Sequence, residues 1–168
     1  MHDVSRQAPW TNTARLSAHY AELAAELDAL LEGETDPIAN AANATAAIFY
    51  SLPELNWAGV YFLRGTELVV GPFQGRPACT RIPLGRGVCG TAAAQRRSVL
   101  VPDVAAFPGH IACDAASRSE LVVPLINAER LLGVLDLDSP RLARFDDADQ
   151  AGCEMLAIML ARHLAGLR

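Results

Sequence analysis

Residues 120–139 read ELVVPLINAERLLGVLDLDS, and this stretch decides the fold that the rest of the chain has to fit. Two apolar runs flank a short connection at Asn127, which is typical of two adjacent antiparallel strands. Asp136 and Asp138 lie two residues apart in the second run, so both side chains point to one face, while the neighbouring leucines point to the other. The segment therefore predicts a hairpin with one apolar face and one face that carries carboxylates.

More strands are predicted upstream, where turn signals separate runs of apolar and β-branched residues. LNWAGVYFL (55–63), the turn at Arg64-Gly65, ELVVGPF (67–73) and CTRIP (79–83) indicate an antiparallel meander. SVLVPDV (98–104) predicts one further strand. Together with the hairpin, these runs predict a mainly antiparallel sheet of about six strands.

Two helices are predicted before the first strand. In residues 13–33 leucine and tyrosine recur at helical spacing until Gly33, which ends the helix. A second helix is predicted from Thr35 or Asp36 as N-cap, with Pro37 in the first turn, where its missing N–H is harmless.

The remaining elements complete the fold class. GRGVCGTAAAQRR (85–97) predicts a short helix, residues 104–118 a long irregular loop, and the segment after Asp146 or Asp147 a closing helix. This order is that of an α+β protein in which the N- and C-terminal helices pack on one face of the sheet. We expect one domain over residues 1–168.

Composition and charge exclude several classes of function. The 168 residues are 51% hydrophobic, enough for a real core, and the net charge of -5 gives no basic surface for nucleic acid. No apolar run reaches the ~20 residues of a membrane span, and the first residues do not resemble a leader. We therefore expect a cytoplasmic protein without nucleic-acid or membrane partners.

The four cysteines and four histidines have the wrong spacing for a zinc knuckle, so no metal site is predicted. Cys153 falls within the apolar period of the last helix and is predicted to be a core residue. The other cysteines lie in or beside glycine-rich or irregular segments. Long loops are usually functional, and the loop before the hairpin contains GHIACDAASRSE (109–120).

Several motifs together carry a family resemblance. NWAGVYF, GPFQGRPAC, GRGVCG, VPDVAAFPGHIACDAASRSELVVP and GVLDLDSP follow one another across residues 56–140. The order of elements resembles a GAF domain, and these motifs resemble those of the free methionine-(R)-sulfoxide reductases. That family consists of stand-alone GAF domains that act on the free amino acid.

The resemblance implies a cysteine mechanism without a bound cofactor. Cys113 matches the family's nucleophile, and Cys89 and Cys79 match its recycling cysteines. Attack on the sulfoxide would release methionine and leave a sulfenic acid, which condenses with a second thiol to a disulfide. Thioredoxin, or another dithiol, is the implied electron donor. The expected partners are thus free methionine sulfoxide and thioredoxin, with a homodimer as one assembly to consider.

The same resemblance implies a pocket for a free amino acid. Glu120, Asp136 and Asp138 match the family's acidic residues, and Trp57 and Tyr61, which share one strand face, match its aromatic wall. An indole suits the S-methyl group of the ligand. Because three carboxyl groups crowd one site, we expect at least one of them to be protonated.

Two other readings fit parts of the sequence. A GAF sensor would bind a small ligand without catalysis, although sensors usually carry an output domain for which this length leaves no room. A thiol peroxidase would share the sulfenic acid on Cys113 but would need no acidic pocket. His110 is expected to hold the loop rather than to act as the base, and Ser117 also flanks the nucleophile.

Overall fold

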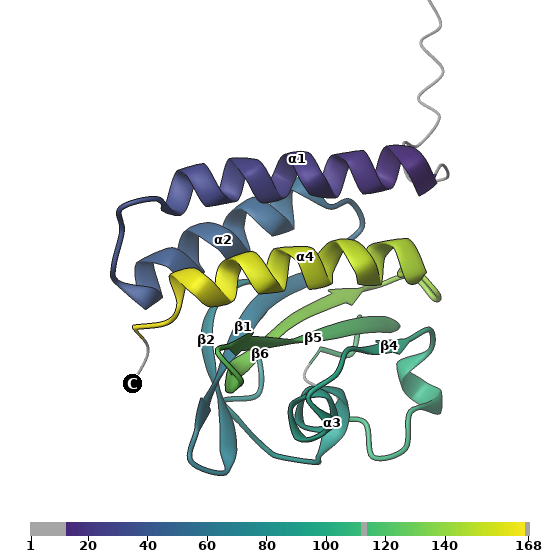
Figure 1. The fold of residues 1–168 in the computed structure, drawn as a ribbon. Helices are drawn as coiled ribbons and strands as arrows, with labels where there is room; N and C mark the ends of the chain where they lie inside the picture. Colours follow the sequence, from purple (N-terminus) through teal and green to yellow (C-terminus); the bar gives the residue numbers. More distant parts are fainter. Residues whose placement is uncertain (1–12, 112–113, 167–168) are drawn as a thin grey trace, which may run out of the picture.

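The structure is a computed structural model that describes residues 13–111 and 114–166 (Figure 1). Six strands form one sheet in the order β3-β2-β1-β6-β5-β4, and every neighbouring pair is antiparallel. This confirms the predicted sheet. The strands are β1 (Trp57–Arg64), β2 (Glu67–Gly75), β3 (Arg81–Pro83), β4 (Val99–Val101), β5 (Ser119–Asn127) and β6 (Arg130–Ser139).

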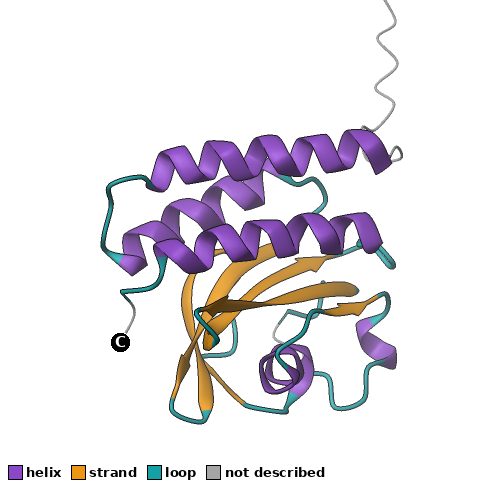
Figure 2. Cartoon of the chain, in the orientation of Figure 1, coloured by secondary structure: helices purple, strands orange, loops and turns teal. Residues whose placement is uncertain are grey.

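The helices divide between the two faces of the sheet (Figure 2). The long helices α2 and α4 contact the strands directly, and α1 packs on top of both. The short helix α3 and a 3-10 turn, η2, lie on the opposite side. The terminal helices therefore share one face, as predicted. Their bounds are α1 (Thr13–Leu31), α2 (Pro37–Ser51), α3 (Gly87–Gln95), η2 (Val104–Ala106) and α4 (Asp147–His163).

Local side-chain bonds explain where α2 and α4 begin. The Asp36 carboxylate accepts from two backbone N–H groups of the first turn of α2, and Pro37 follows at the first helical position. Asp146 caps α4, and Asp149 bonds back to the Asp146 N–H, which completes a capping box. Both starts agree with the sequence.

Other details differ from the predictions. The hairpin reverses at Ala128 and Glu129, which both have positive φ, whereas Asn127 is still paired within β5. Alanine and glutamate are not typical turn residues, so the sequence analysis placed the turn at Asn127 instead. The segment CTRIP forms a strand only from Arg81, so Cys79 lies in an irregular segment before β3.

Strand alternation separates two apolar clusters. On the helix side Leu135 and Leu137 are fully buried against the long helices. On the other side Val134 belongs to a second cluster with α3, and Asp136 and Asp138 line a pocket. The alternation predicted for β6 is confirmed. In the part of the chain that is described, no helix has the length and apolar character that a membrane crossing requires.

A buried polar network joins the helix layers. The Tyr20 hydroxyl donates to Asp149 Oδ1 at 2.8 Å, and Arg144 Nη1 donates to Asp149 Oδ2 at 2.9 Å. The Tyr20 ring covers Gly152, where a Cβ would come within 2.2 Å of it. Cys153 lies beside this network with 0% exposure, and burial raises its pKa to about 12. Its prediction as a core residue is confirmed.

Candidate active site

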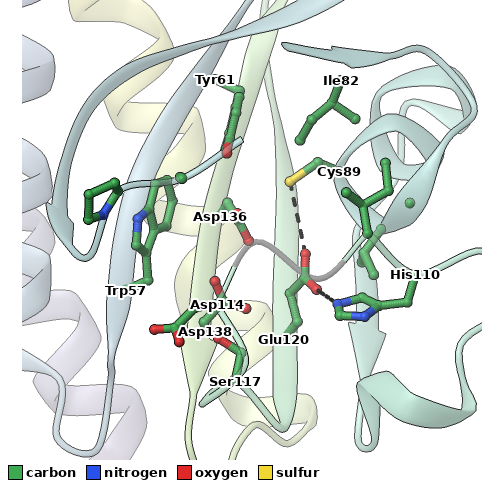
Figure 3. A pocket seen from close by; sticks show the side chains of 15 residues that line it. Trp57, Tyr61, Ile82, Cys89, His110, Asp114, Ser117, Glu120, Asp136 and Asp138 are labelled. Atoms are coloured by element: carbon green, nitrogen blue, oxygen red, sulfur yellow. Dashed lines mark hydrogen bonds and ion pairs between the residues drawn. The ribbon is translucent and has the colours of Figure 1, made fainter. Parts of the chain in front are cut away.

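The register of three central strands brings the predicted pocket residues together. Glu120 on β5 is paired with Asp138 on β6, and Asp138 is paired with Trp57 on β1. Asp136 lies two residues along β6 from Asp138, opposite Gly59. Because all of these side chains leave the sheet on the α3 side, residues more than sixty positions apart in sequence meet in one pocket (Figure 3).

Stacked aromatic rings form one wall of the pocket. The Trp57 and Tyr61 ring centroids lie 5.7 Å apart with an interplanar angle of 28°, and the Phe73 ring also stacks on the indole, at 5.2 Å. The indole covers Gly59, where a Cβ would come within 2.3 Å of a ring carbon. Any side chain at position 59 would clash with the indole, so the wall can form in this way only with glycine there. The sequence predicted Trp57 and Tyr61, but the signals in Gly59 and Phe73 were missed.

The polar atoms of these aromatics bond to the segment after β2. Trp57 Nε1 donates to the Arg76 carbonyl at 3.2 Å, and the Tyr61 hydroxyl donates to the Cys79 carbonyl at 3.1 Å. Burial raises the pKa of Tyr61, so the hydroxyl keeps its proton. Both bonds join β1 to a segment that has no regular secondary structure.

Cys89 enters the pocket from the first turn of α3. Its thiol is buried and donates to Glu120 Oε1 at 3.9 Å. A helix N-terminus lowers the pKa of a thiol, but burial and the carboxyl groups of Asp136 and Glu120 outweigh that effect and raise the pKa of Cys89 well above its usual value. Cys89 is therefore a thiol rather than a thiolate.

The three inner carboxyl groups all have raised pKa values. Burial is the largest cause that raises the pKa of Glu120, Asp136 and Asp138, and their mutual repulsion adds to it. Within the described residues, Asp136 Oδ1 is buried without a hydrogen-bond partner. The expectation of a protonated carboxyl group thus agrees with the direction of all three shifts.

Asp114 has the opposite electrostatic character. Its carboxylate lines the same pocket and accepts from the Ala116 N–H at 2.9 Å and from Asn56 Nδ2 at 3.1 Å. These bonds lower the pKa of Asp114, so it stays ionised. Asn56 also bonds to Ser117 Oγ at 3.0 Å, which ties the loop to the start of β1. The sequence analysis missed Asp114 and Asn56, although both lie within its motifs.

His110 lies between the pocket and the surface. Its Nε2 is 3.6 Å from Glu120 Oε2, and burial lowers its pKa, which favours the neutral imidazole. The contact connects the loop to β5, which agrees with the expected holding role.

The cysteines differ in environment. Cys79 is half-buried and disulfide-bonded, whereas Cys89 and Cys153 carry free thiols. Cys113 lies outside the described residues. Next to it along the chain, Ile111 and Asp114 line the pocket. The described lining consists of Trp57, Tyr61, Pro77, Ala78, Ile82, Gly87, Val88, Cys89, His110, Ile111, Asp114, Ser117, Glu120, Asp136 and Asp138.

One described group could hold a metal ion. Cys89, Glu120 and Asp136 each offer one ligand atom, and these atoms lie within 4.8 Å of one another. A closed structural zinc site uses four ligands, so this group is one donor short. The same atoms also form the floor of the pocket, where an organic ligand would need them.

Comparison with known proteins identifies the family. The model of the GAF domain matches residues 26–164. The free methionine-R-sulfoxide reductase of Escherichia coli is 49% identical, over 87% of this chain and 88% of the relative. The chain belongs to the free methionine-R-sulfoxide reductase family of GAF domains. The yeast free methionine-R-sulfoxide reductase, from Saccharomyces cerevisiae, is 41% identical, over 83% of this chain and 82% of the relative.

A solved structure of the free methionine-R-sulfoxide reductase family has the same fold. The enzyme from Neisseria meningitidis, determined in complex with its substrate, superposes with a TM-score of 0.85. It is 45% identical, with 89% of this chain and 90% of that chain covered. The recognition of the family and of the GAF fold from sequence is therefore confirmed.

Proposed function

We propose that this protein reduces free L-methionine-(R)-sulfoxide to L-methionine. The observation that carries the proposal is the combination, in one pocket, of an aromatic wall, buried inner carboxyl groups whose pKa values are raised, and the Asp114 carboxylate, whose pKa is lowered. The family relatives named for this activity support it. A thiol peroxidase would need neither the aromatic wall nor the acidic floor.

The charges of the pocket suggest how the substrate is oriented. The sulfoxide oxygen must take up protons as it leaves, and the raised pKa values of Glu120, Asp136 and Asp138 suit these groups to donate them. The substrate's ammonium group needs an ionised acceptor, and Asp114 supplies one. We therefore assign the S-methyl end to the Trp57 side, the oxygen to the inner carboxyl groups and the ammonium to Asp114.

The proposed chemistry begins with Cys113. Its sulfur attacks the sulfoxide sulfur and forms a bond to it, and the protonated sulfoxide oxygen is then transferred to the cysteine sulfur as that bond breaks. This releases methionine and leaves a sulfenic acid on the cysteine. A second thiol then attacks the sulfenic sulfur. The S–O bond breaks, the S–S bond forms, and the hydroxide leaves as water with the proton of the attacking thiol. Thioredoxin, or another dithiol, reduces the disulfide in the cytoplasm.

Cys79 is the better resolving thiol of the two recycling candidates. It is half-buried and already disulfide-bonded, which fits a residue that exchanges disulfides. Cys89 is buried with a raised pKa, and a thiol is a much weaker nucleophile than a thiolate. We propose that Cys89 remains a thiol and helps to form the substrate pocket, while Cys79 forms the disulfide.

A turnover assay with chiral separation tests the function. Purified protein, thioredoxin, thioredoxin reductase and NADPH are supplied with each epimer of free methionine sulfoxide. We expect consumption of the R form alone, and no methionine above background with Cys113→Ser, because a hydroxyl is too weak a nucleophile. Binding without turnover in the wild type would instead favour a sensor.

A second assay tests the assignment of Asp114. N-acetylation removes the ammonium charge, so N-acetyl-methionine sulfoxide should react at least about tenfold more slowly than the free amino acid. Asp114→Asn should raise KM for the free amino acid and reduce this discrimination. Asp103→Asn is the matched control, since Asp103 Oδ1 accepts from the Ala105 N–H in a similar local bond but does not line the pocket. Equal KM values in both variants would contradict the assignment.

A further inference from the structure

The pocket wall and the Cys79 segment are joined by hydrogen bonds at both ends of the segment. Trp57 Nε1 donates to the carbonyl of Arg76, and the Tyr61 hydroxyl donates to the carbonyl of Cys79. Residues 76–79 lie between the ladders of β2 and β3, and neither carbonyl belongs to a strand pair. Pro77, between them, has no N–H to donate.

The segment also passes close to the first aromatic residue. At Gly75, where φ is +128°, a Cβ would come within 2.7 Å of the indole and 2.6 Å of the Asn56 carbonyl. Pro77 and Ala78 then line the pocket itself. The aromatic residues that form the pocket wall therefore also contact and hydrogen-bond the backbone segment that contains Cys79.

We propose that Tyr61 and Trp57 are positioning residues for Cys79, which they hold where it can form its disulfide while their rings contact the substrate. The proposal rests on the proposed function, because it concerns the step after methionine has left. Thiol attack on a sulfenic sulfur needs an in-line approach, and a disulfide forms only within a narrow range of Cα separations. A backbone that moves by an ångström would therefore slow the second step more than the first.

Tyr61 is suited to this task because its two functions use different atoms. The ring is 1% exposed and stacks on Trp57, while the hydroxyl bonds to Cys79. Replacing it with phenylalanine keeps the ring and deletes the bond. The two functions can therefore be separated by a single substitution.

The test is a single-turnover experiment without reductant on reduced full-length protein. Wild type, Tyr61→Phe and Trp57→Phe are mixed with stoichiometric free methionine-(R)-sulfoxide. Methionine release is followed by chromatography, the sulfenic acid by dimedone trapping, and the disulfide by alkylation and intact mass. We expect Tyr61→Phe to slow disulfide formation roughly tenfold more than it slows methionine release. The dimedone adduct should accumulate accordingly.

Tyr20→Phe is the matched control. Tyr20 is also a fully buried tyrosine whose hydroxyl donates one hydrogen bond, but it lies in the helix layer. Loss of the Tyr20 hydroxyl should lower thermal stability without changing the ratio of methionine release to disulfide formation. Trp57→Phe, which removes the other donor, should shift that ratio in the same direction as Tyr61→Phe and keeps the test available if Tyr61→Phe does not fold.

Three outcomes are distinguishable. If the wild type releases no methionine, the proposed function fails. If the wild type reacts but both pocket variants form the disulfide at the wild-type rate, the positioning role is wrong and the function stands. If methionine release and disulfide formation slow equally, the two residues act on the substrate alone, which also overturns the proposal.

Discussion

The two faces of the sheet bury polar groups in different ways. On the helix-covered face, Asp149 is buried but is matched by Tyr20 and by the Arg144 guanidinium. On the pocket face, Glu120 and Asp136 are buried next to each other, no arginine of the described residues forms an ion pair with either, and their pKa values are raised. One face is arranged for stability, and the other keeps groups that burial disfavours, as expected where a ligand supplies the missing partners.

The largest effect should come from an inner carboxyl group. Glu120→Gln keeps the shape but removes a proton that can be transferred, so we expect kcat/KM for free methionine-(R)-sulfoxide to fall about 1,000-fold, within the usual range for loss of a general acid. The thermal midpoint should stay equal or rise. Glu154→Gln is the control, because Glu154 accepts from Ser98 outside the pocket. Undiminished activity in Glu120→Gln would contradict the claim that the buried carboxyl groups of the pocket face serve catalysis.

The helix-covered face should give the reverse pattern. Leu156 is fully buried in the core of α4, so Leu156→Ala should lower the free energy of unfolding by about 3 kcal/mol through lost burial and a cavity. Denaturant unfolding measures this loss, and kcat/KM of the folded protein should be unchanged. Met155→Ala, at a 45% exposed neighbour, should cost much less. A large loss of kcat/KM in Leu156→Ala would mean that the two faces are coupled.

The smallest effect concerns pH. The pKa of Glu120 is raised by folding, so the folded state binds its proton more tightly than the unfolded state does. Its contribution to stability is therefore complete below the unfolded pKa and is lost as pH rises through the folded pKa. Relative to wild type, Glu120→Gln should gain stability between pH 5 and pH 8, as measured by urea unfolding. A constant difference across this range would show that Glu120 is ionised in the folded protein.

Most of the fold could be predicted from the periodicity of the sequence. Alternation in β6 assigned Asp136 and Asp138 to one face, and Asp36 with Pro37 marked the start of α2. The hairpin turn was less readable, since Ala128 and Glu129 adopt positive φ without the residues that usually do so. There the pairing of the flanking strands determines the backbone, and local propensity does not.

For the site, the motifs predicted which residues take part but not their charge states or hydrogen bonds. Trp57, Tyr61, Glu120, Asp136 and Cys89 meet in one pocket, but their charge states depend on burial, which the sequence does not give. The roles of Asp114 and of the Tyr61 hydroxyl depend on which backbone groups lie within hydrogen-bond distance. Such contacts arise between distant segments, so only the folded structure reveals them.

The position of β6 has a consequence for how the protein is made. This strand is the last of the described strands in sequence, yet it lies between β1 and β5 at the centre of the sheet. During synthesis β1 is therefore without this neighbour until all the other described strands have been made, and its edge can pair with other chains. Substitutions that slow the docking of β6 should therefore lower the yield of soluble protein in the cell before they change anything measurable in the purified enzyme.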